Sequence, residues 1–156
     1  QPTLEQHEVL PVVQAAMDYM RARTSNKIEY RLLGEEAIRL SGKEAKAMLC
    51  VPLFEWVIEN LCKNAIDAMQ GCGSLDIYIY RSENNVVIEV TDTGKGIPSG
   101  NFKNVFRPGF TTKRRGWGLG LSLAKRIVEE YHNGKIYVKS SQIGIGTTFA
   151  VEMRLQ

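Results

Sequence analysis

Three polar residues share one face of a predicted helix in the stretch ENLCKNAIDAM, which covers residues 59–69. Asn60, Asn64 and Asp67 stand at positions i, i+4 and i+7, a spacing that places side chains above one another on a helix. An amide oxygen there would be a neutral, hard ligand for Mg²⁺, with phosphate oxygens and water as the other ligands. Asparagines on a helix surface also occur without a function, so a solvated polar face is the alternative interpretation.

The stretch DTGKGIP, residues 92–98, places an acid directly before two closely spaced glycines at the end of a predicted strand. An ionised Asp92 carboxylate is a hydrogen-bond acceptor only. Buried against a purine, it would accept a hydrogen bond from the exocyclic amine of adenine and disfavour guanine, which carries a carbonyl group there. Gly94 and Gly96 would let the backbone come close to such a ligand. The alternative is a local Asx-type turn.

A second glycine run, GWGLGL at residues 116–121, opens another predicted helix. Backbone N–H groups that glycine leaves uncovered at the start of a helix form an anion site. Lys113, together with Arg114 or Arg115, would add positive charge for a triphosphate. The run matches neither the P-loop pattern nor the dinucleotide pattern GxGxxG after a strand. A simple turn before a helix is the alternative.

The elements that must position these residues follow from the spacing of apolar side chains. This spacing predicts helices over residues 10–22, 52–69 and 119–131. Strands are predicted over residues 27–33, 36–40, 75–80, 86–92, 135–140 and 147–155, with a weaker candidate over 45–50. Residues 98–115 show little periodicity, and loops of that length are usually functional lids or disordered. The order of elements fits an α/β sandwich with helices on one face.

Composition limits the class of protein. A chain of 156 residues suits a single domain, and its first residue, Gln1, leads us to expect a fragment of a longer protein. The net charge of +3 is too mild to imply nucleic acid, and no apolar run reaches the roughly 20 residues that span a bilayer. Three cysteines without CxxC spacing favour buried free thiols in a reducing compartment. His132 follows the third predicted helix, where we expect contact with the helix dipole.

Taken together, five stretches resemble a known family in order and spacing. They are ENLCKNAIDAM (59–69), DTGKGIP (92–98), FRPGFTTK (106–113), GWGLGL (116–121) and GIGTTF (144–149). The chain resembles the ATP-binding catalytic domain of sensor histidine kinases, in the gyrase–chaperone–kinase–MutL (GHKL) superfamily. The resemblance covers nearly the whole chain and implies one domain over residues 1–156. The implied fold is the Bergerat fold, an α+β two-layer sandwich in which a mixed, mostly antiparallel sheet of about five strands packs on three helices, with a mobile ATP lid over about 98–115.

The resemblance also implies roles for individual residues. Asn64 would coordinate Mg²⁺, with Asn60 beside it near the phosphates, and Lys113 would reach the terminal phosphate; these three form the catalytic set. Asp92 would bind the adenine amine, supported by Thr147 through water. Phe106 and Phe110 would anchor the lid. The full set implied to bind ATP is Asn60, Lys63, Asn64, Asp67, Asp92, Gly94, Gly96, Ile97, Thr112, Lys113, Gly116, Gly118, Leu119, Gly120, Leu121 and Thr147.

Three departures from the family pattern bear on the lid, and one absent residue bears on the reaction. Trp117 stands where the family has a small or slender residue, Gly109 replaces an expected aromatic, and Asp67 stands where many kinases carry lysine. Asn60 stands where gyrase-like and chaperone-like relatives carry a glutamate that activates water. A site without that base should hold ATP for transfer rather than hydrolyse it.

The expected function is therefore that of a protein-histidine kinase catalytic domain. It would donate the γ-phosphate of ATP to a histidine on a separate dimerisation domain of the same kinase, homodimeric at full length, and the phosphoryl group would pass to a response regulator. We expect no nucleic-acid partner, a cytoplasmic location, and a membrane link only through a parent protein, for which an inner-membrane sensor is one candidate. Two rivals are a nucleotide-sensing module that transfers nothing and an ATPase clamp, which Asn60 disfavours.

Overall fold

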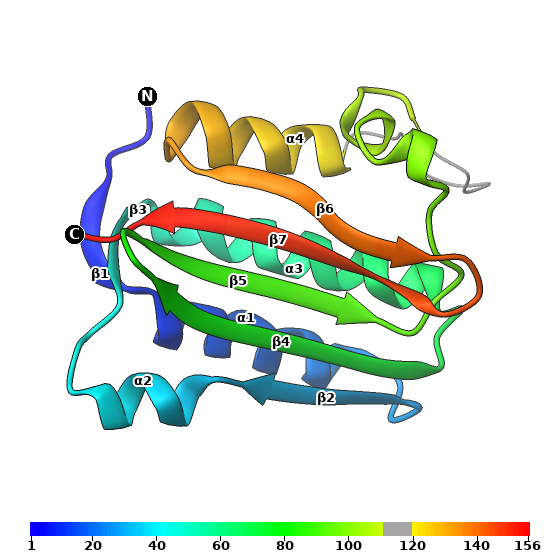
Figure 1. Cartoon of the computed structure of the whole chain (residues 1–156), viewed down its shortest axis with the longest axis horizontal. Coiled ribbons are helices and arrows are strands. Elements are labelled where there is room, and N and C mark those ends of the chain that lie inside the picture. The colour runs from blue at the N-terminus through cyan, green and yellow to red at the C-terminus, as the bar shows by residue number, and fades with distance from the viewer. Residues whose placement is uncertain (111–119) are drawn as a thin grey trace.

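A five-stranded sheet forms the centre of the computed structural model, which describes residues 1–110 and 120–156 (Figure 1). The strands lie in the order β2-β4-β5-β7-β6, and β2 pairs parallel with β4 while the other neighbours pair antiparallel. The mixed, mostly antiparallel sheet is thus confirmed. Its strands are β2 (Ile28–Leu33), β4 (Gly73–Ser82), β5 (Asn85–Asp92), β6 (Lys135–Gln142) and β7 (Gly146–Arg154).

Three helices cover one face of this sheet, as predicted (Figure 1). They are α1 (Val9–Arg23), α3 (Val51–Ala68) and α4 (Gly120–Arg126), and α4 continues into a π-helical turn, η3 (Ile127–Tyr131). Helix α3 has a proline in its first turn and ends at Ala68, and Gln70 and Gly71 just beyond it adopt left-handed backbone conformations. No helix in the described part of the chain is long and apolar enough to cross a membrane.

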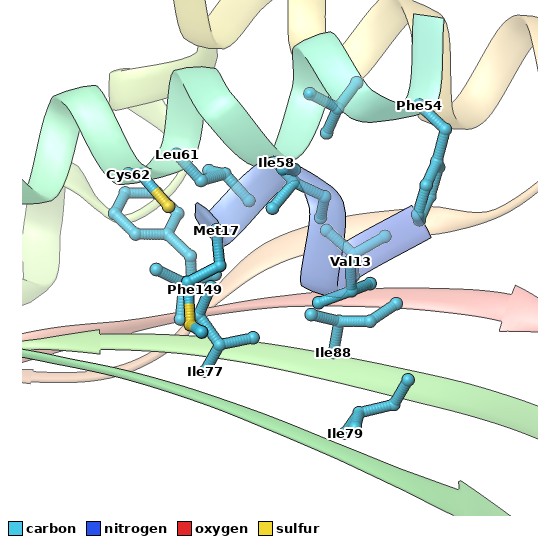
Figure 2. Close-up of a cluster of buried hydrophobic side chains, with 14 of the residues drawn as sticks. Val13, Met17, Phe54, Ile58, Leu61, Cys62, Ile77, Ile79, Ile88 and Phe149 are labelled. Atoms are coloured by element: carbon cyan, nitrogen blue, oxygen red, sulfur yellow. The ribbon is translucent and has the colours of Figure 1, made fainter. Parts of the chain in front are cut away.

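The core lies between the helices and the sheet. Side chains of α1 and α3 meet those of β4, β5 and β7 there, and Figure 2 shows Val13, Met17, Phe54, Ile58 and Leu61 above Ile77, Ile79, Ile88 and Phe149. Each such side chain stabilises the fold by about 1.5–3 kcal/mol when it leaves water. The strand residues alternate between this buried face and the opposite one, which fixes the side to which each polar residue of the sheet points.

Two elements differ from the sequence-based expectations. The predicted strand over residues 36–40 is wrong, because this stretch forms helix α2 (Glu35–Ser41). Gly34 precedes it with φ 89°, Glu35 pairs with Arg39 one turn later at 3.1 Å, and Ile38 is its buried residue. A short strand, β1 (Glu5–Glu8), was not predicted, because its sequence EQHE carries no apolar alternation. It pairs antiparallel with β3 (Lys46–Leu49), the strand that was the weaker candidate.

The described part of the predicted lid, residues 98–110, contains two short 3₁₀ turns, η1 (Ser99–Asn101) and η2 (Asn104–Phe106). Phe106 is buried and meets Phe149 edge to face, with ring centroids 6.0 Å apart. Phe110 is half-buried against the core. Both phenylalanines therefore attach this segment to the body of the domain.

His132 closes the π-helical turn and joins it to the start of α3. Its Nδ1 lies 2.9 Å from the carbonyl oxygen of Ile127, and its Nε2 accepts the backbone N–H of Cys50 at 3.1 Å. The imidazole must therefore carry its hydrogen on Nδ1, where it contacts the end of the helix, and keep Nε2 as an acceptor. Burial lowers the pKa of His132, which favours this neutral form.

The three cysteines are unpaired, and they differ in exposure. Cys62 is buried in the core, whereas Cys50 is half-buried and Cys72 is exposed. The expectation of buried free thiols is therefore confirmed for Cys62 and wrong for Cys72. Burial raises the pKa of Cys62 to about 12, so this thiol stays protonated and serves as an apolar packing group.

Candidate functional site

The carboxylate of Asp92 is buried at the end of β5, with 3% of the residue exposed. Its Oδ1 accepts the backbone N–H of Gly94 at 2.8 Å, which closes an Asx-type turn. Burial raises the pKa of Asp92, whereas backbone hydrogen bonds from Gly94 and Thr147 lower it. Because an ionised carboxylate has about four acceptor positions, the turn leaves capacity for a donor on a ligand. The turn and the base-binding interpretation are therefore compatible.

The two glycines after Asp92 make room for protein backbone. A β-carbon on Gly94 would lie 2.6 Å from the carbonyl oxygen of Ala68, in the last turn of α3. One on Gly96, where φ is +83°, would lie 2.4 Å from the carbonyl oxygen of Gln142 at the end of β6. The backbone N–H of Lys95 donates to the same Ala68 oxygen at 3.1 Å. The glycines therefore hold the loop between α3 and the β6–β7 turn, and this defines the position of Asp92.

Thr147 lies directly opposite Asp92 in the β5–β7 ladder and is buried. Its Oγ1 is 2.8 Å from Oγ of Ser141, and the Ser141 oxygen also accepts the backbone N–H of Ile97 at 2.7 Å. Ile97 is half-buried and packs against the core. The structure thus brings together Asp92, Ile97 and Thr147, all three of which the sequence placed in one site.

Ser141 and Gly146 take part in this cluster and were not predicted. A β-carbon on Gly146 would lie 2.0 Å from the carbonyl oxygen of Asp92, so no other residue fits there without moving β5. The motif GIGTTF contains Gly146 and could have suggested it. Ser141 carried no such signal, because its inward direction depends on an irregularity of β6 that alternation does not reveal.

The predicted polar face lies on α3. Its two amide residues, Asn60 and Asn64, which we call the amide stripe, are half-buried, whereas Lys63 and Asp67 are exposed. Asn60 contacts the start of α4, since a β-carbon on Gly120 would lie 2.9 Å from its Oδ1. Leu121 is half-buried against the core. The stripe and the beginning of α4 therefore lie together, and both are joined through α3 to the loop that holds Asp92.

Several predicted site residues fall outside the described part of the chain. They are Thr112, Lys113, Gly116, Gly118 and Leu119, and Trp117 lies among them. Their contacts with phosphate stay predictions.

Glu59 lies on another side of α3 from the contact with Gly120. Burial raises the pKa of Glu59, with smaller effects from Glu55, Arg23 and Lys63. Arg23 is the last residue of α1, so Glu59 is near the α1 side of the helix. Glu59 and Asn60 are neighbours in the chain and are therefore separated by about 100° around the axis of α3.

These features fit an adenine nucleotide. A buried carboxylate supplies an acceptor for an amine, and Gly94 and Gly96 fix the loop that carries it. Amide side chains of α3 lie beside the start of α4, and such groups can hold a hard cation and phosphate.

Two curated relatives have similar sequences. Sporulation kinase C of Bacillus subtilis (strain 168) is 29% identical over 154 residues, which is 99% of this chain and 34% of the relative. Sensor histidine kinase ZraS of Escherichia coli (strain K12) is 44% identical over 95 residues, which is 61% of this chain and 20% of the relative. The chain thus spans about a third or less of the length of these relatives.

Solved structures share the fold. The catalytic domain of histidine kinase ThkA superposes with a TM-score of 0.81 at 23% identity, covering 97% of each chain. The same kinase in complex with response regulator protein TrrA gives a TM-score of 0.80 at 21% identity, covering 98% of this chain and 42% of that chain. Residues 51–156 match the family model described as histidine kinase-, DNA gyrase B- and HSP90-like ATPase. The match includes Asn60, Asp92, Gly120 and Thr147, and the chain belongs to this family of ATPases.

Proposed function

We propose that this chain is the ATP-binding catalytic domain of a two-component sensor histidine kinase. The observation that carries the proposal is the contact between Asn60 and Gly120, which supports a phosphate site lined by an uncharged amide at the start of α4. Asp92 would bind the adenine amine at the other end of the site. The similarity to sporulation kinase C over 99% of this chain supports the same function.

The residues near the start of α4 favour phosphoryl transfer over hydrolysis. Water attack on the γ-phosphate is helped by a carboxylate that accepts a proton, and Asn60 cannot accept one. Glu59, the next residue along α3, lies on another side of the helix from Asn60. The contribution of this chain to the reaction is thus to position the nucleotide and to stabilise its charge.

Asn64 would hold Mg²⁺ through its side-chain oxygen, together with phosphate oxygens and water. The ion would supply positive charge to the phosphates. Asn60 and Asn64 are one helical turn apart on α3, so a nucleotide at Gly120 would meet both.

The partners proposed are the acceptor-histidine dimerisation domain of the same kinase, in a homodimer, and a response regulator. The complex of histidine kinase ThkA with response regulator protein TrrA supports the second. We place the domain in the cytoplasm, where ATP is available, with any membrane link made by the parent protein. Residues 1–156 would form one catalytic domain of that longer kinase.

Phosphotransfer to the kinase's own acceptor-histidine domain tests the proposal. The chain alone should bind Mg-ATP without labelling itself, and it should label the added domain slowly, because a tether normally raises the effective concentration to around millimolar. The product should be acid-labile and alkali-stable, and labelling should disappear with Asn64→Ala.

Two results would contradict the proposal. ATP binding without transfer, even to a genetically fused acceptor domain, would indicate a nucleotide-sensing module. Rapid ATP hydrolysis by the lone chain would indicate an ATPase, with Glu59 as the nearest candidate for the base.

A further inference from the structure

A β-bulge in β6 turns Ser141 towards the nucleotide site. Up to the bulge, Ile136 and Val138 face the buried side of the sheet, opposite Val151 and Phe149. The pairing then shifts by one residue between Val138 and Ser140, so that Ser141 lies opposite Thr147. Because side chains alternate along a strand, the inserted residue reverses which side each later residue faces. Ser141 consequently points inward beside Thr147.

Ser141 has defined hydrogen-bond partners in this position. Its oxygen accepts the backbone N–H of Ile97 at 2.7 Å, and that contact uses no hydrogen of the serine. The single hydroxyl hydrogen has two acceptors within reach, Oγ1 of Thr147 at 2.8 Å and the carbonyl oxygen of Gly146 at 3.1 Å. Both contacts are within hydrogen-bond distance, and the shorter one joins Ser141 to Thr147, where either hydroxyl can donate.

The donor in the contact between Ser141 and Thr147 decides what the Thr147 hydroxyl can offer a ligand. When Ser141 donates, Oγ1 of Thr147 accepts, and its own hydrogen is available for a ligand or a bound water. Thr147 and Asp92 face each other across β5 and β7. With Ser141 as the donor, the two residues present one donor and one acceptor side by side.

We propose that Ser141 is a positioning residue that sets base specificity by making Thr147 a hydrogen-bond donor. The proposal rests on the proposed function, in which the site binds ATP. The edge of adenine has a donating amine beside an accepting ring nitrogen, and Asp92 with Thr147 complements that order. Hypoxanthine and guanine have the reverse order, an accepting carbonyl beside a donating N–H. Ser141 thus acts on the base through Thr147, without touching it.

The test compares the affinities of the chain for ATP and ITP, whose base is hypoxanthine, by calorimetry. Wild type should prefer ATP. Ser141→Ala should lower the ratio of the two affinities about twofold to tenfold, the effect of one hydrogen bond. Ser141→Cys keeps the size of the side chain but replaces the hydroxyl by a weak donor, and it should lower the ratio in the same direction. Thr147→Val should lower it at least as far.

The double variant Ser141→Ala with Thr147→Val separates positioning from packing. If Ser141 acts through Thr147, the double variant should have the same ratio as Thr147→Val alone. The control is Thr91→Val, which breaks the hydroxyl contact of 2.7 Å between Thr91 and Thr148 on the same two strands. Thr91 alternates with Asp92 and faces the other side of the sheet, so its substitution should leave the ratio unchanged.

Three results would overturn the inference. Equal losses of ATP and ITP affinity in Ser141→Ala and Ser141→Cys would mean that Ser141 only supports the fold. Additive losses in the double variant would mean that Ser141 acts independently of Thr147. A wild-type chain that binds ITP but not ATP would overturn the inference together with the proposed adenine site, whereas the first two results would leave that site intact.

Discussion

The side-chain amide of Asn60 lies against the first residue of α4, Gly120, so closely that a β-carbon there would be 2.9 Å from Oδ1 and 3.0 Å from Nδ2. The two residues are 60 positions apart in the chain and belong to the two helices that hold the predicted phosphate end of the site. Their contact gives the glycine at this position a role in leaving room for the Asn60 amide, independently of any bound phosphate.

Gly120→Ala should therefore raise the stability of the fold and lower the affinity for Mg-ATP. Alanine in a helix stabilises the fold by roughly 0.5–1 kcal/mol relative to glycine. Its β-carbon would displace the Asn60 amide, and we expect Mg-ATP affinity to fall about tenfold, the cost of about 1.4 kcal/mol of binding free energy. Thermal unfolding and calorimetry measure the two effects. Gly100→Ala is the control, because a β-carbon there meets nothing within 4 Å. Unchanged affinity in Gly120→Ala would remove Asn60 from the site.

Asp92→Asn should weaken ATP binding. The amide keeps the size of the side chain but removes the charge and places a donor near the adenine amine. Losing a hydrogen bond to a charged group costs about 1.5–3 kcal/mol, or roughly tenfold to a hundredfold in affinity. The control is Asp76→Asn, which breaks an ion pair with Arg31 on the other side of the sheet. If calorimetry gives the same affinity for Asp92→Asn as for the control, Asp92 does not bind the base.

Asn64→Ala should abolish the part of ATP binding that depends on Mg²⁺ and leave the fold intact, because alanine is well tolerated in a helix. ATP affinity measured with and without Mg²⁺ checks this expectation. Gln14→Ala, which removes an amide from α1, is the matched control and should keep the response to the metal. An equal response to Mg²⁺ in both variants would assign the ion to another ligand.

His132 should make the stability of the fold depend on pH. Burial holds its folded pKa below the ordinary value of 6.5, and a proton on Nε2 would face the N–H of Cys50. As pH falls below about 6.5, the unfolded chain binds a proton that the folded chain does not, so the free energy of unfolding decreases towards the folded pKa. Above that range the contribution is constant.

Urea unfolding at pH 7.5 and pH 5.5 measures this effect. Wild type should lose stability between the two values, and His132→Gln should lose less, because an amide does not titrate. A His7→Gln control leaves His132 in place and should retain the wild-type difference. The same pH dependence in wild type and His132→Gln would show that another group is responsible.

Much of the fold was predictable because local patterns determine it. The apolar spacing of α3 and the alternation in β4 and β5 agree with the structure to within a few residues, since these segments bury one face against a common core. Helix α2 was mistaken for a strand because EAIRL is too short to distinguish the two periods, and the cap at Gly34 depends on its backbone conformation. Strand β1 exists through its pairing with β3, a contact between distant segments.

In the candidate site too, local sequence patterns predicted some features, and contacts between distant segments determine the others. The order of Asp92 and its glycines suggested both a turn and an acceptor, and the structure contains the turn beside a buried carboxylate. That Gly94 and Gly96 contact Ala68 and Gln142 could not be read from the motif, because it depends on how α3 and β6 pack. The inward direction of Ser141 depends on a one-residue bulge, which changes the geometry without a change in composition.

The attachment of β1 and of Gln156 to strand β3 has a mechanical consequence. The strand is held on one side by β1, and the N–H of Gln156 donates to the carbonyl of Lys46 at 2.9 Å, so segments near both ends of the chain attach to the same four residues. Both ends lie at one end of the sheet in Figure 1, and Asp92 at the other. Tension applied at β1 or at Gln156 would act on their hydrogen bonds to β3. Only Cys50 separates β3 from α3, so the same strand connects these two segments to the helix that carries Asn60 and Asn64.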